Sequence, residues 1–176
     1  MTYKHLFTRA LSANPERLHF AAHSHHLWPD ASYDGQVEAW EDAARLADLK
    51  WGRIMGPVWE EAQGHIAREL QLPDPSTLSF SPNTHDFLVR IFSAIPKRPV
   101  RVLATDGEFH SFRRQMARWV EASEAELVNA PADELVATAE AGGFDLIFAN
   151  HVLFNSGAII SEFERLAALA KPEGPW

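Results

Sequence analysis

The stretch Asp145-Leu146-Ile147-Phe148-Ala149-Asn150 is a nearly continuous apolar run between two polar residues. A short run without polar alternation is typical of a β-strand that is buried on both faces. Strands of this kind occur in parallel sheets that carry helices on both sides. The stretch therefore predicts that the surrounding chain forms a layered α/β fold.

The sequence before and after this run supports the same architecture. Further strands are predicted at Leu78–Phe80, at Val100–Ala104 and at Glu126–Ala130. Helical spacing of apolar residues fills the segments between them, and Ser161-Glu162-Phe163-Glu164 has the pattern of a capping box. The expected helices cover 84–95, 110–120, 133–140 and 161–169. Strands that alternate with helices over about a hundred residues predict a three-layer αβα domain with a mostly parallel sheet.

The N-terminal part of the chain has a different pattern, with helical spacing of apolar residues. An acidic amphipathic helix is predicted from Tyr33 to Leu49, with its apolar side around Trp40. A linker is expected at 51–57, followed by a second helix that runs to about Leu72. The helix is predicted from apolar residues that recur at four-residue spacing; they are Val58, Ala62, Ile66 and Leu70. We expect residues 1–50 to form an arm and a helix, and residues 51–176 to form part of the large domain.

Composition narrows the class of protein. The 176 residues carry a formal net charge of −8 and no cysteine. This charge disfavours nucleic acid and anionic membrane surfaces as partners, and the missing cysteines remove disulfides and thiolate chemistry. The first residues lack the apolar core of a signal peptide. A cytoplasmic enzyme or binding module, acting on a small molecule, is the expectation.

Ligands of parallel α/β sheets bind beyond the carboxyl ends of the strands, so the loops after the predicted strands are the places to search. The first loop carries Asn83 and Thr84 at the start of a helix, where N–H groups and the helix dipole suit a phosphate; simple helix capping is the alternative. The second loop carries Phe109, an aromatic plate for a flat ring. The third is the polar stretch 150–157. A flat, phosphorylated, heteroaromatic cofactor would suit these three loops.

The order of these motifs resembles the N-terminal half of a class V, fold-type-I pyridoxal-phosphate enzyme, and most closely kynureninase and its relatives. The resemblance runs from about Leu18 to the end of the chain. It rests on Asn83-Thr84, on Phe109-His110-Ser111-Phe112 and on His151-Val152-Leu153-Phe154-Asn155-Ser156-Gly157. In the second motif His110 stands where the family has Pro, and Phe112 where it has Asp.

The resemblance implies roles for individual residues. Asn83 and Thr84 would bind the phosphate of pyridoxal 5'-phosphate, and Phe109 would stack on its ring with Ser111 nearby. His151 and Ser156 would line the polar edge of the ring. The early pair His23-Ser24 falls where the family contacts its substrate. The implied reaction is the conversion of an amino acid by a homodimer, such as Cβ–Cγ hydrolysis, desulfuration or transamination.

Two further elements of the family pattern are not found in the sequence. The family holds the pyridine nitrogen with an Asp and forms a Schiff base with a Lys, both further along the chain than the motifs seen here. The lysines present do not occupy contexts that would lower the pKa of an amine; they are Lys4, Lys50, Lys97 and Lys171. We therefore expect an N-terminal fragment of the enzyme, with no catalytic residue of its own and little activity in isolation.

Two other hypotheses remain open at this stage. The cluster His23-Ser24-His25-His26 could ligate a metal, with His85, Asp86, His110 and His151 as further ligands, in a metal-dependent hydrolase. Alternatively, the chain could be a non-catalytic α/β binding module that keeps the architecture without the chemistry.

Overall fold

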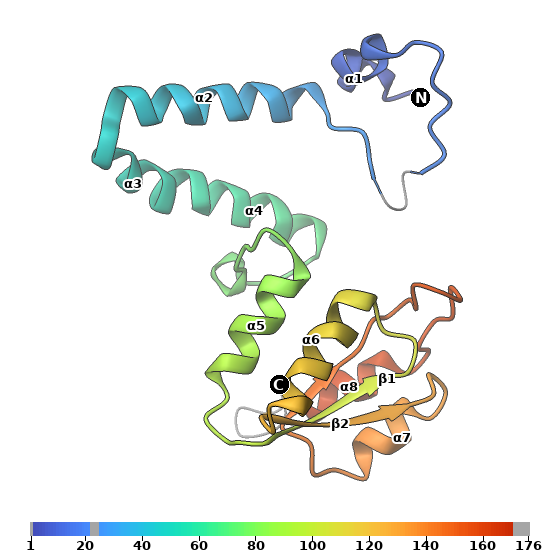
Figure 1. Cartoon of the computed structure of the whole chain (residues 1–176). Helices are drawn as coiled ribbons and strands as arrows, with labels where there is room; N and C mark the ends of the chain where they lie inside the picture. Colours follow the sequence, from blue (N-terminus) through green and yellow to red (C-terminus); the bar gives the residue numbers. More distant parts are fainter. Residues whose placement is uncertain (1, 22–24, 171–176) are drawn as a thin grey trace. The chain divides into compact units, whose positions relative to one another are not determined.

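The structure is a computed structural model, and it describes residues 2–21 and 25–170. The chain divides into two compact units, one that ends at Ser79 and one that begins at Phe80 (Figure 1). This division lies further along the chain than residue 50, where the sequence placed the start of the large domain. The first unit is helical, and the second contains the sheet.

The helical unit begins with η1 (Lys4–Leu6) and α1 (Thr8–Ala13), which are followed by the long helix α2 (Asp30–Leu46). The remaining elements are η2 (Ala47–Leu49), α3 (Lys50–Arg53), η3 (Ile54–Val58), α4 (Trp59–Glu69) and η4 (Pro75–Thr77). The Asp30 carboxylate accepts hydrogen bonds from the backbone N–H groups of Thr8 and Arg9, at 3.0 and 2.9 Å, and thereby joins α1 to α2. The long helix expected from Tyr33 to Leu49 is confirmed within a few residues.

Two features of this unit differ from what the sequence pattern indicates. The segment 51–57 is not an extended linker, because it continues as α3 and the π-helical turn η3, with a kink at Gly56 before Pro57. The apolar residues at four-residue spacing in α4 also do not mark its buried face. Ile66 and Leu70 are exposed, whereas Gln63 and Ala67, one position away, are buried. The Gln63 side-chain amide donates to the Leu78 carbonyl at 2.7 Å. This hydrogen bond turns the face of α4 that carries Gln63 toward the segment after the helix, which explains why this face is buried.

A polar contact also closes the corner between α2 and α3. Asp42, whose side chain is almost fully buried, lies 2.5 Å from the guanidinium of Arg45 and 2.5 Å from that of Arg53. The second contact is an ion pair without hydrogen-bond geometry, since Asp42 Oδ2 has no hydrogen-bond partner. Asp42 is the buried residue of α2. The helical unit is therefore held at this corner by charge rather than by an apolar seam.

The second unit confirms the α/β prediction with a parallel, three-stranded sheet in the order β2-β1-β3. Strand β1 (Val100–Thr105) pairs along its full length with β2 (Ala125–Ala130), from Val100 opposite Ala125 to Thr105 opposite Ala130. Strand β3 (Leu146–Phe148) pairs with the middle of β1 and forms the other edge. The run 145–150 is thus an edge strand that is half-buried, rather than one enclosed on both faces.

Helices pack on both faces of this sheet and give it three layers (Figure 1). Helices α5 (Thr84–Ala94) and α6 (His110–Glu121) cover one face, where Phe92 and Met116 pack on Val102. Helices α7 (Leu135–Glu140) and α8 (Phe163–Leu169) cover the other, where Leu135 packs around Leu103. Successive residues of β1 point to opposite faces, so one strand supplies both cores.

Two local predictions failed in this part of the chain. The segment Leu78–Phe80 does not join the described sheet, and the Leu78 carbonyl accepts from the side chain of Gln63. Helix α8 forms, but without a capping box. Its N-cap is Glu162, whose side chain caps no N–H group and instead pairs with Arg165 at 2.5 Å.

Candidate functional site

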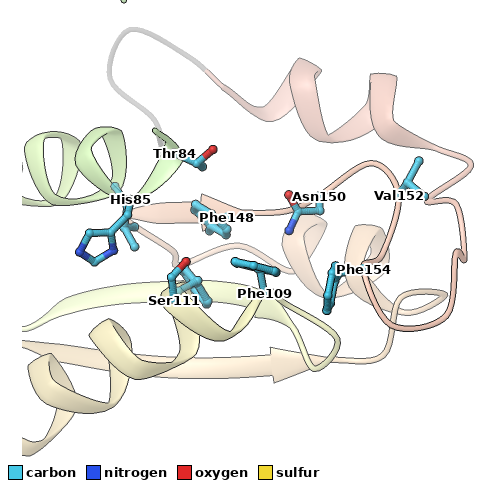
Figure 2. A pocket seen from close by; sticks show the side chains of 10 residues that line it. Thr84, His85, Phe109, Ser111, Phe148, Asn150, Val152 and Phe154 are labelled. Carbon is cyan, nitrogen blue, oxygen red and sulfur yellow. The ribbon is translucent and has the colours of Figure 1, made fainter. Parts of the chain in front are cut away.

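A pocket of about 300 Å³ opens beyond the carboxyl ends of β1 and β3 (Figure 2). The strand order explains its place. The chain passes from β1 to β2 on one side and then to β3 on the other, so the loops after β1 and β3 diverge. Such a switch point is where parallel α/β sheets form ligand crevices. The pocket is lined by Thr84, His85, Leu88, Phe109, Ser111, Phe112, Phe148, Asn150, Val152 and Phe154.

The first wall of the pocket is the N-terminus of α5. Asn83 is the N-cap, and its side-chain oxygen accepts from the Asp86 N–H at 3.0 Å. The N–H groups of Thr84 and His85, in the first turn, have no intrahelical acceptor and lie where the helix dipole is positive. The Thr84 hydroxyl adds a further donor beside them. This end of α5 is suited to an anion.

Asp86 contributes a negative charge to the same helical turn. A hydrogen bond from the Ser81 hydroxyl and the neighbouring guanidinium of Arg90 lower the pKa of Asp86 below its ordinary value. Arg90 Nε lies 2.7 Å from the carboxylate and offsets its charge. Asp86 and Arg90 thus form an ion pair beside the N-terminus of α5.

Aromatic rings form the second wall. Phe109, which is 37% exposed, meets Phe154 edge to face, with their ring centroids 4.8 Å apart. Phe112 stacks on Phe148 at 4.2 Å. Phe109 precedes α6, Phe148 ends β3 and Phe154 lies in the following loop, so the wall joins three segments. Figure 2 shows the rings of Phe109, Phe148 and Phe154 around the same hollow.

A buried carboxylate ties the two loops together behind this wall. The Glu108 side chain, 1% exposed, accepts from the Thr105 hydroxyl at 2.7 Å and from the Asn150 N–H at 3.3 Å. Its other oxygen accepts from the Asn150 side-chain amide. Next to it, Gly107 lies so close to Leu153 that an added Cβ would stand 3.0 Å from the Leu153 Cδ1. The loops after β1 and β3 are therefore packed against each other.

The stretch His151–Gly157 forms a tight hairpin, and Val152 and Phe154 within it line the pocket. Val152 pairs with Ile159 in an isolated antiparallel bridge, and Gly157 has a φ of +69°. The Ser156 hydroxyl oxygen accepts from the Ala158 N–H at 3.2 Å, which stabilises the turn. The Ser-Gly pair of this motif thus has a local structural role.

The residues predicted from sequence are only partly brought together. Thr84, Phe109 and Ser111 line the pocket. Asn83 is next to the pocket, as the N-cap of α5. Ser156 and His151 are outside the lining: Ser156 lies in the hairpin, and the ring centroid of His151 is 5.2 Å from that of Phe163. His23 and Ser24 lie outside the described residues.

Sequence reasoning pointed to the loops that carry Asn150, Phe154 and Glu108 but gave these residues no role, and it placed Phe148 only within a predicted strand. The position of Asn150 at a strand end was a usable signal. Glu108 offered none, because an acidic residue in a loop is ordinarily exposed, and its burial depends on donors that come from distant parts of the chain.

The described residues contain no group of three or more His, Asp or Glu side chains placed to hold a metal ion. The histidines of the second unit have other neighbours: His85 lines the pocket and the His110 ring lies 4.1 Å from that of Phe109. Lys97 pairs with Asp145 at 2.8 Å, away from the pocket.

Searches of protein-family models, of curated proteins and of solved structures find no match to this chain. Among the helices in the described ranges, none is both long and apolar enough to traverse a bilayer. The assignment of function therefore depends on the site itself.

Proposed function

We propose that the pocket binds pyridoxal 5'-phosphate and that the chain is the N-terminal part of a class V, kynureninase-like enzyme that converts an amino acid. The observation that supports this most is that Thr84 and Phe109, which are 25 positions apart in the sequence, line one pocket at the switch point of the sheet. These are the residues that the resemblance assigns to the phosphate and to the ring.

The chemistry of the lining fits both ends of such a cofactor. The hydroxyl of Thr84 and the first N–H groups of α5 suit a phosphoester, through charge-assisted hydrogen bonds. The rings of Phe109 and Phe148 suit the flat pyridine, since aromatic faces stack at offset geometry. The volume of about 300 Å³ is within the range of small-molecule sites.

The residues of this chain then have distinct tasks. Thr84 and the helix terminus hold the phosphate, and Phe109 fixes the plane of the ring. Phe154, packed against Phe109, limits the access of water to one side. When bound, the cofactor supplies an electron sink for bonds at the α-carbon of an amino acid. No lysine is among the lining residues, so an amine that joins the cofactor covalently would have to come from outside this set.

The test is binding of a cofactor form that cannot react with surface lysines. Pyridoxine 5'-phosphate has an alcohol in place of the aldehyde, and its binding to the purified chain can be measured by calorimetry. We expect saturable binding that inorganic phosphate competes away. Thr84→Val, which removes one hydroxyl, is expected to weaken binding about tenfold, because a hydrogen bond to a charged group is lost.

A matched control is Thr138→Val on α7, a residue that does not line the pocket and whose change is expected to leave binding unaltered. Phe109→Leu keeps the apolar volume but removes the stacking face, and is expected to weaken binding several-fold. If the wild-type chain shows no saturable binding, or if Thr84→Val and Thr138→Val behave alike, the proposal is wrong.

A further inference from the structure

Asn150, in the loop after β3, is a polar residue of the pocket lining, and the two ends of its side-chain amide are not equivalent. An amide has a nitrogen that donates and an oxygen that accepts, and the hydrogen bonds around it decide which end faces where. Here the nitrogen donates to Glu108 Oε2. The oxygen is thereby the end left for the pocket. Figure 2 draws this oxygen on the side of Thr84.

Glu108 holds this orientation because its two side-chain oxygens accept hydrogen bonds from donors on every side. Three donors converge on it: the Thr105 hydroxyl, the Asn150 N–H and the Asn150 side-chain amide. Turning the amide over would set the Asn150 oxygen against a carboxylate oxygen in a buried place, where an unmatched polar contact is costly. The hydrogen bonds to Glu108 therefore favour the orientation in which the Asn150 nitrogen faces the carboxylate.

We propose that Glu108 is a positioning residue that sets the hydrogen-bonding polarity of the pocket, so that the pocket selects a phosphorylated ring bearing an N–H or O–H donor. This rests on the proposed function and narrows its ligand class. Glu108 does not line the pocket and acts through Asn150, whose oxygen accepts the proton that the ring presents.

The decisive variant is Glu108→Gln, because glutamine has the same shape and can keep all three hydrogen bonds. Its oxygen can accept from the Asn150 N–H and from Thr105, while its NH₂ group replaces the second carboxylate oxygen. The Asn150 amide then has to turn over so that its oxygen accepts from that NH₂ group. The pocket would present a donor where the wild-type chain presents an acceptor.

The experiment compares two probes on the wild-type chain and the variant. Pyridoxine 5'-phosphate carries ring donors, and benzyl phosphate carries none. The wild-type chain is expected to prefer pyridoxine 5'-phosphate, and Glu108→Gln is expected to reduce this preference about tenfold, while the Kd of benzyl phosphate changes less than about twofold. The control Glu126→Gln removes one charge from an exposed site on β2 and is expected to keep the wild-type preference.

The outcomes separate the two proposals. If neither probe binds the wild-type chain, the proposed function fails and this inference fails with it. If both bind but Glu108→Gln keeps the wild-type preference, Glu108 is merely structural and only the inference is overturned. A Glu108→Gln chain that does not fold also overturns it, because the flipped amide would then not satisfy the buried groups. Glu108→Ala, which leaves three donors unpaired, is expected to lose the folded second unit.

Discussion

The two units of this protein hold their apolar residues in opposite ways. The second unit buries two apolar clusters, one on each face of β1, where Phe92 is 2% exposed, and its strongly exposed apolar residues, such as Phe154, lie in the loops. In the helical unit, Trp40 is 74% exposed and Trp51 is 55% exposed, while the buried residues of α2 and α4 are Asp42, Gln63 and Ala67. The comparison teaches that apolar periodicity in a helix predicts a face, but not that the face is covered.

The largest expected effect is a loss of unfolding free energy, and it tests which unit is stabilised by buried aromatic residues. Phe92→Ala removes a ring that stacks on Trp119 at 3.7 Å, and is expected to destabilise the second unit by about 3–5 kcal/mol. Trp40→Ala, which deletes an even larger side chain, is expected to change stability by less than about 0.5 kcal/mol. Urea titrations followed through NMR signals of β1 and α2 measure both.

Ile91→Ala is the matched control on α5, one residue from Phe92 but exposed. Its effect is expected to be well below that of Phe92→Ala. A cost of several kcal/mol for Trp40→Ala would contradict the contrast, since it would mean that the aromatic residues of the helical unit are packed.

Substitution of one glycine in each unit is expected to change stability by a smaller amount, and the two changes are expected to have opposite signs. Gly64 lies inside α4 with open space where a Cβ would stand, so Gly64→Ala is expected to stabilise by about 0.5–1 kcal/mol. Gly107 faces buried Leu153, and Gly107→Ala is expected to cost about 1 kcal/mol through overpacking. Thermal unfolding of the two variants measures the signs. A Gly107→Ala variant that is at least as stable as the wild-type chain would show that the loops after β1 and β3 are not packed as described.

The smallest expected effect is the loss of stability at acidic pH that protonation of Asp145 causes. Partial burial acts to raise the pKa of Asp145, but the hydrogen bonds from Lys97 and from the Arg101 N–H outweigh it and lower the pKa below its ordinary value. A carboxyl with a lowered pKa in the folded state contributes stability above its unfolded pKa and loses it as the pH falls through the folded value. Since Lys97 is mostly exposed, the contribution is expected to stay below about 1 kcal/mol.

Urea titrations between pH 7 and pH 2.5 test this with Asp145→Asn. The variant is expected to be less stable than the wild-type chain at pH 7 and to approach it as the pH falls below about 4. Lys97→Met is expected to show part of the same change. A difference between Asp145→Asn and the wild-type chain that stays constant over this range would contradict a titrating contribution.

Much of the second unit was predictable from the sequence, because its signals are local. The strands predicted at 100–104 and 126–130 are confirmed as β1 and β2, and β1 to β3 form the parallel sheet that their alternation with helices predicts. The strand predicted at 78–80 does not join the described sheet, since an apolar alternation does not show whether a partner strand lies beside it. The Leu78 carbonyl accepts instead from Gln63, a residue of α4.

For the site, the sequence by itself determined the helix terminus at Thr84, the ring of Phe109 and the strand end at Asn150, because each depends on residues close together in the chain. Only the tertiary structure decided that these residues share a pocket, that His151 and Ser156 lie outside its lining, and that Glu108 is buried behind it. The physical reason is that a carboxylate becomes buried only where donors from separate strand ends meet it, and the order of the strands brings those donors together.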